Sequence, residues 1–246
     1  MAEISSEAFA QTRDQLHWAA QLLSAAADVT LEKADDDSHS NLAWEAATNS
    51  LQNRAGCNIK VVEFALECHD GSLDLVGKTL AEAATWLGEK LNAEIRFRDY
   101  EMPANAVQNG APFSPDREQL MAAANQFTFA QKSLSGNGEL RIWPHHFDLG
   151  FWSPSEIEGK SIGGGFSLGD QSYNQPYFYI NPYGIDKPES LPQLRHGHWS
   201  NHWFGAVLTT AEMDSSGDAE TMAAEFVALA IEECEQLILA DIGGIT

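Results

Sequence analysis

The stretch Val61-Val-Glu-Phe-Ala-Leu-Glu-Cys-His-Asp-Gly-Ser-Leu-Asp-Leu75 decides the fold class of this chain. From Val62 to Cys68 apolar residues recur at every second position. A period of two is typical of a strand with one face on a core and the other in water. The dipeptide Asp70-Gly71 favours a two-residue hairpin turn, and the alternation then resumes. We therefore predict an antiparallel hairpin that begins with a strand over 58–68.

Helical patterns flank this hairpin. Apolar residues three and four apart predict an amphipathic helix over 5–29. Thr79 and Glu82 have the spacing of a capping box, which predicts that a second helix follows. Ser114-Pro115-Asp116 offers a helix start with a proline at the first helical position. A last helix is predicted over 218–239, and further extended segments over 41–53, 94–100, 140–152, 171–183 and 202–210.

The order of these elements predicts an α+β fold, mostly antiparallel sheet with flanking helices, because runs of strands occur without regular βαβ alternation. The length and the 43% hydrophobic content suffice to bury a core. We expect residues 1–246 to form a single compact domain, and two intimately packed halves are the alternative. The halves 1–103 and 114–246 both follow the order helix, strands, helix. An internal duplication is therefore a hypothesis that rests on element order alone.

The charge balance disfavours two classes of partner. The chain has 36 acidic and 14 basic residues, for a formal net charge of -22. Such a surface repels phosphate backbones and anionic lipid, so we expect no nucleic-acid and no membrane partner. We interpret the acidic residues as a solvated coat, and an acidic face for a cationic partner is the alternative.

The cysteines and the N-terminus point to a cytoplasmic protein. Cys57, Cys68 and Cys234 are too few and too scattered for a disulfide framework or a Cys-x-x-Cys metal site, so we expect reduced thiols. The first nine residues lack a basic segment followed by an apolar one, and no apolar run approaches the length of a membrane span. These features predict a cytoplasmic location.

Residues 143–204 concentrate Trp, Tyr, Phe, His and Gly, so we expect any functional site here. The segments Trp143-Pro-His-His-Phe-Asp-Leu-Gly150, Gly163-Gly-Gly-Phe-Ser-Leu-Gly-Asp170 and Pro176-Tyr-Phe-Tyr-Ile-Asn-Pro-Tyr183 resemble a bacterial family of uncharacterised proteins that share a domain of unknown function. A weaker likeness covers Ser38-His-Ser-Asn-Leu-Ala-Trp44. The resemblance implies a shared fold and carries over no catalytic residue.

The Trp-Pro-His-His stretch suggests one site in this region. If residues 141–152 are extended, Trp143 and His145 lie on an aromatic face, and His146 and Asp148 project together on the opposite one. An imidazole and a carboxylate placed in this way can form an acid/base pair or ligate a divalent metal, with His196, His198 and His202 as further nitrogen donors. A packed structural role for these histidines is the alternative.

The tyrosines suggest a second feature. Tyr173, Tyr177, Tyr179 and Tyr183 fall at mostly even offsets, so their hydroxyls are expected to line one face, as a ligand-binding wall or as a dimer surface. A polar-edged aromatic core is the alternative. The glycines at 163–169 lack the Gly-Lys-Ser/Thr of a phosphate-binding loop, and we expect them to allow close backbone approach.

Two functional hypotheses follow. The first is a protein that binds a small molecule in an aromatic, histidine-bearing pocket formed by His146, Asp148, Tyr177, Tyr179, Asn181 and Trp143, and that also forms a homodimer. The second is a metal-dependent hydrolase that uses His146, Asp148, His198 and His202. A third class, a purely structural or interaction protein, stays open. The sequence does not decide whether the chain is an enzyme, and it names no cofactor beyond a candidate divalent metal.

Overall fold

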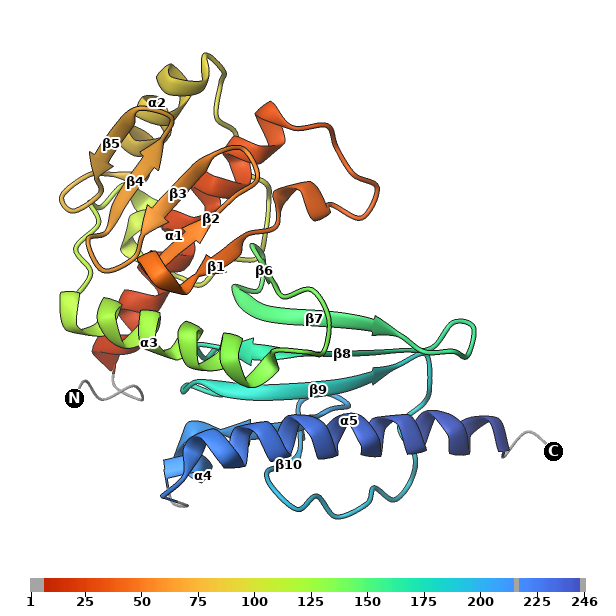
Figure 1. The fold of residues 1–246 in the computed structure, drawn as a ribbon. Helices are drawn as coiled ribbons and strands as arrows, with labels where there is room; N and C mark the ends of the chain where they lie inside the picture. The colour runs from red at the N-terminus through yellow and green to blue at the C-terminus, as the bar shows by residue number, and fades with distance from the viewer. Residues whose placement is uncertain (1–6, 215–216, 244–246) are drawn as a thin grey trace. The chain divides into compact units, whose positions relative to one another are not determined.

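The computed structural model describes residues 7–214 and 217–243, and its fold is α+β with two antiparallel sheets (Figure 1). The chain forms two units. The first comprises residues up to 128 together with 141–148, and the second comprises 129–140 and the residues from 149 onward. These boundaries fall within a helix and at the start of a strand, not in the loop that separates the two halves considered above.

The first unit consists of a meander of short strands and three helices. The sheet order is β1-β2-β3-β4-β5, so neighbours in sequence are neighbours in the sheet. Its elements are α1 (Glu7–Thr30), β1 (Ala43–Glu45), β2 (Ser50–Gln52), β3 (Cys57–Lys60), β4 (Ala65–Cys68), β5 (Gly71–Asp74), α2 (Leu80–Leu91) and the first two thirds of α3 (Arg117–Leu134), with the 3-10 turns η1 (Ser38–Ser40), η2 (Ala46–Thr48) and η3 (Ala106–Asn109).

The predicted hairpin at Asp70-Gly71 is confirmed, because β4 pairs with β5 and Cys68 lies opposite Gly71. The single strand expected over 58–68 is wrong. Residues 61–64 form a turn in which Phe64 has a φ of 51°, and the chain reverses between β3 and β4. In the sequence Phe64 fits the alternation of apolar and polar residues that is typical of a strand. In the structure it is the last residue of a tight turn, and its side chain is buried.

Helix α1 is buried on all sides rather than amphipathic, because every residue from Gln15 to Ala27 is buried. Small alanines let neighbouring segments approach the helix closely. Its polar side chains bond to loop backbone: the Ser114 amide donates to Gln15, and the Trp18 indole donates to the Pro103 carbonyl. Buried polar groups normally need such partners, so α1 organises the irregular parts of the first unit.

The segment 94–100 is not a strand, although its alternation predicts one. Phe97 is partly exposed, and the backbone from 95 to 105 is irregular. The capping box at Thr79 and Glu82 is confirmed at the start of α2, where the Thr79 amide donates to Glu82 and the Glu82 amide donates to Thr79. Local side-chain chemistry therefore predicted a helix start correctly, whereas alternation alone predicted a strand incorrectly.

The prediction of reduced thiols is wrong for two of the cysteines. Cys57 and Cys68 lie directly opposite each other in the β3–β4 ladder and form a disulfide. The sequence separates them by eleven positions, and only the turn at 61–64 brings them together. Cys234 is free and buried in the last helix, and burial raises the pKa of its thiol to about 12.

The second unit is a sheet covered by helices. The strand order is β10-β11-β9-β8-β7-β6, of which β6 (Arg141–Trp143) is counted with the first unit. Helix α5 packs along β9, β8 and β11, as the blue helix in Figure 1 shows. The remaining elements are β7 (Asp148–Pro154), β8 (Ser161–Ser167), β9 (Tyr177–Tyr183), β10 (His198–Trp199), β11 (Ala206–Thr209), α4 (Thr210–Asp214) and α5 (Ala219–Gly243).

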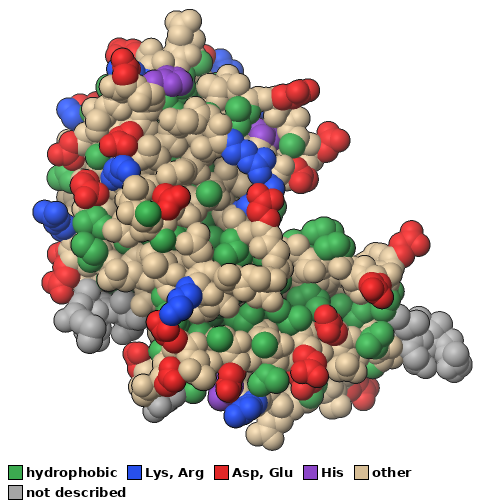
Figure 2. Space-filling view, viewed as in Figure 1, with side chains coloured by type: hydrophobic (Ala, Val, Ile, Leu, Met, Phe, Trp, Pro, Cys, Tyr) green, Lys and Arg blue, Asp and Glu red, His purple; other side chains and the backbone are tan. Residues whose placement is uncertain are grey.

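Acidic side chains are spread over the visible surface and do not gather in one patch, as the red atoms in Figure 2 show. The solvated acidic coat stays an interpretation of the sequence. No helix in the described part of the chain has both the length and the apolar character needed to cross a membrane.

Candidate functional site

The tyrosines of β9 share one face of the second sheet. Alternate residues of a strand point to the same side, so Tyr177, Tyr179, Asn181 and Tyr183 lie on a common surface, which we call the tyrosine face. The expectation of a shared face is confirmed for Tyr177, Tyr179 and Tyr183 by the β8–β9 register, whereas Tyr173 lies in the loop before β9. Tyr177 is buried and its hydroxyl donates to Asp170 at 2.6 Å, whereas Tyr183 is 47% exposed.

Glycines of β8 make room for the tyrosine rings. A Cβ atom on Gly163 would lie 2.7 Å from the ring of Tyr183, and one on Gly165 would lie 2.6 Å from the hydroxyl oxygen of Tyr179. The two rings therefore lie against bare backbone, as expected for glycines that allow close approach. Any other residue at these positions would displace an aromatic ring.

Trp152 of β7 extends the tyrosine face. A Cβ atom on Gly164 would meet the ring of Phe151, so Phe151 lies on the face opposite to Gly163 and Gly165. Trp152 is the next residue, and alternation places it on the tyrosine face. Its side chain is 61% exposed, the largest value among the exposed large hydrophobic residues of the described chain.

The opposite face of the sheet is covered. Phe166, Phe178 and Ile180 are fully buried there, and Phe129 at the end of α3 packs edge-on against Phe178. Lys160 at the margin of the sheet forms an ion pair with Asp241 of α5 at 2.9 Å. The helices of the second unit therefore cover this side, and its tyrosine face is the side that carries exposed aromatic rings.

One end of the tyrosine face is covered by two loop residues. The indole of Trp203 donates to the Asn181 side chain at 3.1 Å. The ring of Tyr173 packs against Tyr177 and Trp203 with centroids 5.0 and 5.6 Å apart. These contacts place the Tyr173 ring against one end of the tyrosine face.

A chain of hydrogen bonds runs from Tyr173 to a carboxylate. The Tyr173 hydroxyl lies 3.2 Å from Nε2 of His198, and Nδ1 of His198 lies 3.1 Å from Oε1 of Glu212. A carboxylate only accepts, so Nδ1 carries the hydrogen and Nε2 of the neutral ring accepts. The side chains of His198 and Glu212 are 40% and 38% exposed. The hydroxyl, imidazole and carboxylate thus form a series in which the imidazole and the carboxylate are partly exposed.

Glu212 is fixed by the end of β11. The amide and hydroxyl of Thr209 donate to its Oε2 at 2.8 and 2.7 Å. Burial alone would raise the pKa of the Glu212 carboxyl, but these hydrogen bonds and the one from His198 outweigh it and leave the pKa below its ordinary value. Glu212 is therefore a charged acceptor for His198 at neutral pH. Sequence reasoning missed it, although Thr209-x-x-Glu212 has capping-box spacing.

The predicted arrangement of His146 and Asp148 is wrong. Residues 144–147 form a turn, in which the Phe147 amide donates to the Trp143 carbonyl at 2.7 Å and Phe147 has a φ of 56°. His146 is exposed at this turn, while Asp148 is buried at the start of β7. They do not emerge side by side from an extended strand, because the turn changes the direction of the side chains.

The surroundings of the turn are aromatic. His145 is half-buried between the rings of Tyr100 and His146, and Trp143 lies edge-on to it. Burial lowers the pKa of His145, and the neighbouring His146 and Arg98 add to this effect. Trp143, His146 and Asp148 belong to the first unit, whereas Tyr177, Tyr179 and Asn181 belong to the second.

The metal hypothesis finds no support in the structure. No group of three or more His, Cys, Asp or Glu side chains among the described residues could hold a metal ion. His198 is engaged by Tyr173 and Glu212, and His202 is exposed with its ring edge-on to Tyr173.

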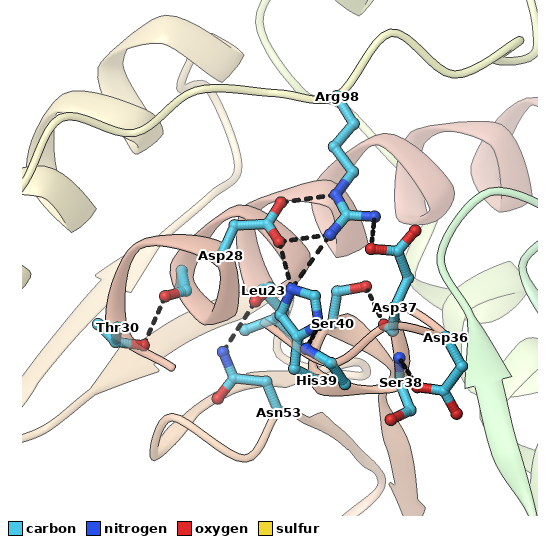
Figure 3. A network of polar contacts seen from close by, with 12 residues as sticks. Leu23, Asp28, Thr30, Asp36, Asp37, Ser38, His39, Ser40, Asn53 and Arg98 are labelled. Carbon is cyan, nitrogen blue, oxygen red and sulfur yellow. Dashed lines mark hydrogen bonds and ion pairs between the residues drawn. The ribbon is translucent and has the colours of Figure 1, made fainter. Parts of the chain in front are cut away.

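Sequence reasoning also missed a polar network in the first unit (Figure 3). Arg98 binds both carboxylate oxygens of Asp28 at 2.7 and 2.6 Å and reaches Asp37 at 2.9 Å. His39 accepts from the Ala34 amide at Nδ1, so its Nε2 carries the hydrogen and donates to Asp28 at 2.9 Å. Both imidazole nitrogens are thus occupied, and the network joins the end of α1 to two loops.

A separate shallow pocket of about 150 Å³ lies between Gln193–His196 and α5. Ligand pockets typically measure about 300–1,000 Å³. Phe226 and Leu229 line it, but none of the predicted ligand-binding residues does. The exposed surface of the tyrosine face is therefore the better candidate site.

No protein-family model, curated protein or solved structure matches this chain.

Proposed function

We propose that the protein binds a small, ring-shaped ligand without negative charge on the tyrosine face of the second unit. The observation that carries this proposal is that the rings of Tyr179 and Tyr183 lie against the glycines of β8, on the face that also carries the exposed Trp152. Exposed aromatic rings held next to one another on a sheet are a recurrent feature of binding surfaces.

The chemistry of the face favours such a ligand. Trp152 and Tyr183 offer apolar rings, while the tyrosine hydroxyls and the Asn181 amide offer hydrogen bonds. These side chains carry no formal charge at neutral pH, and a net charge of -22 repels anions. A neutral sugar or a neutral heterocycle fits this combination, since either can stack on a ring and form hydrogen bonds at its rim.

The proposal can be tested by ligand-observed NMR with a library of neutral mono- and disaccharides and neutral heterocycles. Hits should weaken roughly tenfold in Tyr183→Ala and Trp152→Ala, because a stacked aromatic contact is worth about 0.5–1.5 kcal/mol beyond its area. Phe97→Ala, which removes a partly exposed aromatic side chain of the first unit, is the matched control and should leave binding unchanged. Equal loss in the control, or no hit at all, would contradict the proposal.

The same face could instead join two copies of the chain, which is the homodimer alternative. Light scattering after size exclusion separates these two uses of the surface. A monomeric wild type supports ligand binding. A wild-type dimer that Tyr183→Ala converts to monomer would assign the face to self-association and overturn the proposal.

The cellular location bears on the ligands that the protein meets. A cytoplasmic location stays a prediction of the sequence. The Cys57–Cys68 disulfide argues against it, because cytosolic thiol buffers keep such pairs reduced. A count of thiols in the protein purified from its native source addresses this point directly.

A further inference from the structure

We propose that Tyr173, His198 and Glu212 form a proton relay that activates the Tyr173 phenol as a nucleophile toward a neutral acyl ester. This inference goes beyond ligand binding and does not depend on it, since it concerns the hydrogen bonds at the end of the tyrosine face and not the stacked rings.

The order of the groups carries the inference. Nucleophilic hydroxyls in proteins are activated by an imidazole that is itself oriented by a carboxylate, and this constellation is recognised by geometry and not by fold. Here the hydroxyl lies 3.2 Å from Nε2 and the carboxylate 3.1 Å from Nδ1. These distances are at the outer end of the hydrogen-bond range, as is common for catalytic contacts without substrate.

The Glu212 carboxylate has hydrogen bonds beyond the one to His198, unlike an isolated ion pair on the surface. Thr209 donates twice to Oε2 of Glu212, which leaves Oε1 directed at His198. Thr209 at the end of β11 therefore fixes the position of Glu212, in addition to the contact with His198. The imidazole is fixed in turn, because its Nδ1 hydrogen has a charged acceptor.

The phenol itself has two partners. Besides His198, the Tyr173 hydroxyl lies 3.3 Å from Oγ of Ser200, to which it can donate. When the ring is neutral, the phenol hydrogen can point to Nε2. When the ring is protonated, Nε2 donates to the phenol oxygen and the phenol hydrogen can point to Ser200. Both proton positions therefore keep their hydrogen bonds, which is what proton transfer along the series requires.

The proposed reaction is an acyl transfer from the ester to Tyr173, in which each bond that forms is matched by one that breaks. The Tyr173 oxygen forms a bond to the acyl carbon, the phenol proton passes to Nε2 of His198, and the bond from the acyl carbon to the leaving alcohol breaks. The proton on His198 then passes to that alcohol. Water hydrolyses the acyl-tyrosine to a carboxylic acid and restores the phenol. A neutral ester is the fitting class, because the charge of -22 repels anionic substrates.

The test uses benzenesulfonyl fluoride, in which a sulfonyl group stands in for the acyl group. Phenol attack forms an S–O bond and releases fluoride, and peptide mass spectrometry identifies each modified tyrosine. The exposed phenol of Tyr183 is the internal reference. We expect Tyr173 to react at least roughly tenfold faster than Tyr183, since general-base assistance contributes about 10²–10⁴-fold.

Variants separate the relay from simple exposure. His198→Gln and Glu212→Gln should reduce the rate at Tyr173 to that of Tyr183. His202→Gln is the matched control, since His202 also packs against Tyr173 but takes no part in the relay. Equal rates at the two tyrosines in the wild type, or a Tyr173 rate that is unaffected by His198→Gln, would overturn the proposal.

A measurement on the wild type covers the case in which a variant does not fold. Nitrogen-15 NMR distinguishes the two neutral tautomers of His198. The relay requires the hydrogen on Nδ1, where Glu212 accepts it. Finding it on Nε2 would overturn the proposal without any substitution.

Discussion

Acidification should destabilise the first unit through one buried histidine. His17 lies in α1, stacks on Phe147 with ring centroids 4.9 Å apart, and donates from Nε2 to the Pro144 carbonyl at 2.8 Å. Burial lowers the pKa of His17 from 6.5 to about 4, against the opposing effect of the Pro144 hydrogen bond. Because the pKa is lower in the folded state, the unfolded state binds the proton first as the pH falls.

The sign and size follow from this difference. The stabilising contribution is complete above pH 6.5, the unfolded value, and is lost as the pH falls toward 4. A shift of this size corresponds to about 3 kcal/mol in full, since one pKa unit is worth about 1.4 kcal/mol. Between pH 7 and 4.5 we expect the wild type to lose about 2 kcal/mol through His17. His17→Gln cannot take up this proton and keeps an amide that can reach Pro144.

Urea unfolding at the two pH values measures the effect as a difference. The free energy of unfolding of the wild type should fall by about 2 kcal/mol more than that of His17→Gln, because all other titrating groups are common to both proteins. NMR titration of His17 gives the folded pKa directly. Equal pH dependence in the two proteins, or a folded pKa near 6.5, would refute the reasoning.

Three further predictions concern stability and cysteine chemistry. Arg98→Ala should lower the free energy of unfolding in urea by roughly 2 kcal/mol, because it leaves the partly buried carboxylate of Asp28 without its bidentate partner. Arg96→Ala removes an exposed ion pair and should cause no measurable change in the same experiment. Gly165→Ala should cost about 1–3 kcal/mol by thermal unfolding, since the new methyl group meets backbone and a tyrosine ring. Gly71→Ala should cost less, because its methyl group meets mainly the flexible end of a lysine side chain, with the edge of the Trp86 ring 3.0 Å away. Equal losses would show that the tyrosine packing is not constrained. Ellman's reagent should detect no thiol in the native protein and one thiol, that of Cys234, after denaturation without a reducing agent. Three thiols after such denaturation would show that Cys57 and Cys68 do not form a disulfide.

Local chemistry made most of the secondary structure predictable. The Asp70-Gly71 hairpin and the Thr79–Glu82 capping box depend on residues at most a few positions apart, and both occur in the structure. The α+β class follows from the order of such elements. The strand predicted at 94–100 was wrong because alternation records only which side chains are apolar, whereas a strand also needs a partner for its backbone.

The candidate site was predictable only in part. The even spacing of Tyr177, Tyr179 and Tyr183 placed them correctly on one face, since strand geometry alone fixes that relation. The connection of His198 to Tyr173 and Glu212 depends on contacts across separate segments, which no spacing in the sequence reveals.

Two of the misread strands, 58–68 and 140–152, share one cause, and this bears on the duplication hypothesis. Both contain a four-residue turn that ends in a buried phenylalanine with positive φ, Phe64 at 51° and Phe147 at 56°. In each case an isoleucine precedes the phenylalanine by five positions and a leucine follows it by two, namely Ile59 and Leu66, and Ile142 and Leu149. Positive φ is uncommon for a bulky residue, so its recurrence within the same pattern is not explained by turn propensity alone. The duplication stays a prediction, but it now rests on a shared turn in addition to element order, and it requires that the two hairpins superpose together with the helices that precede them.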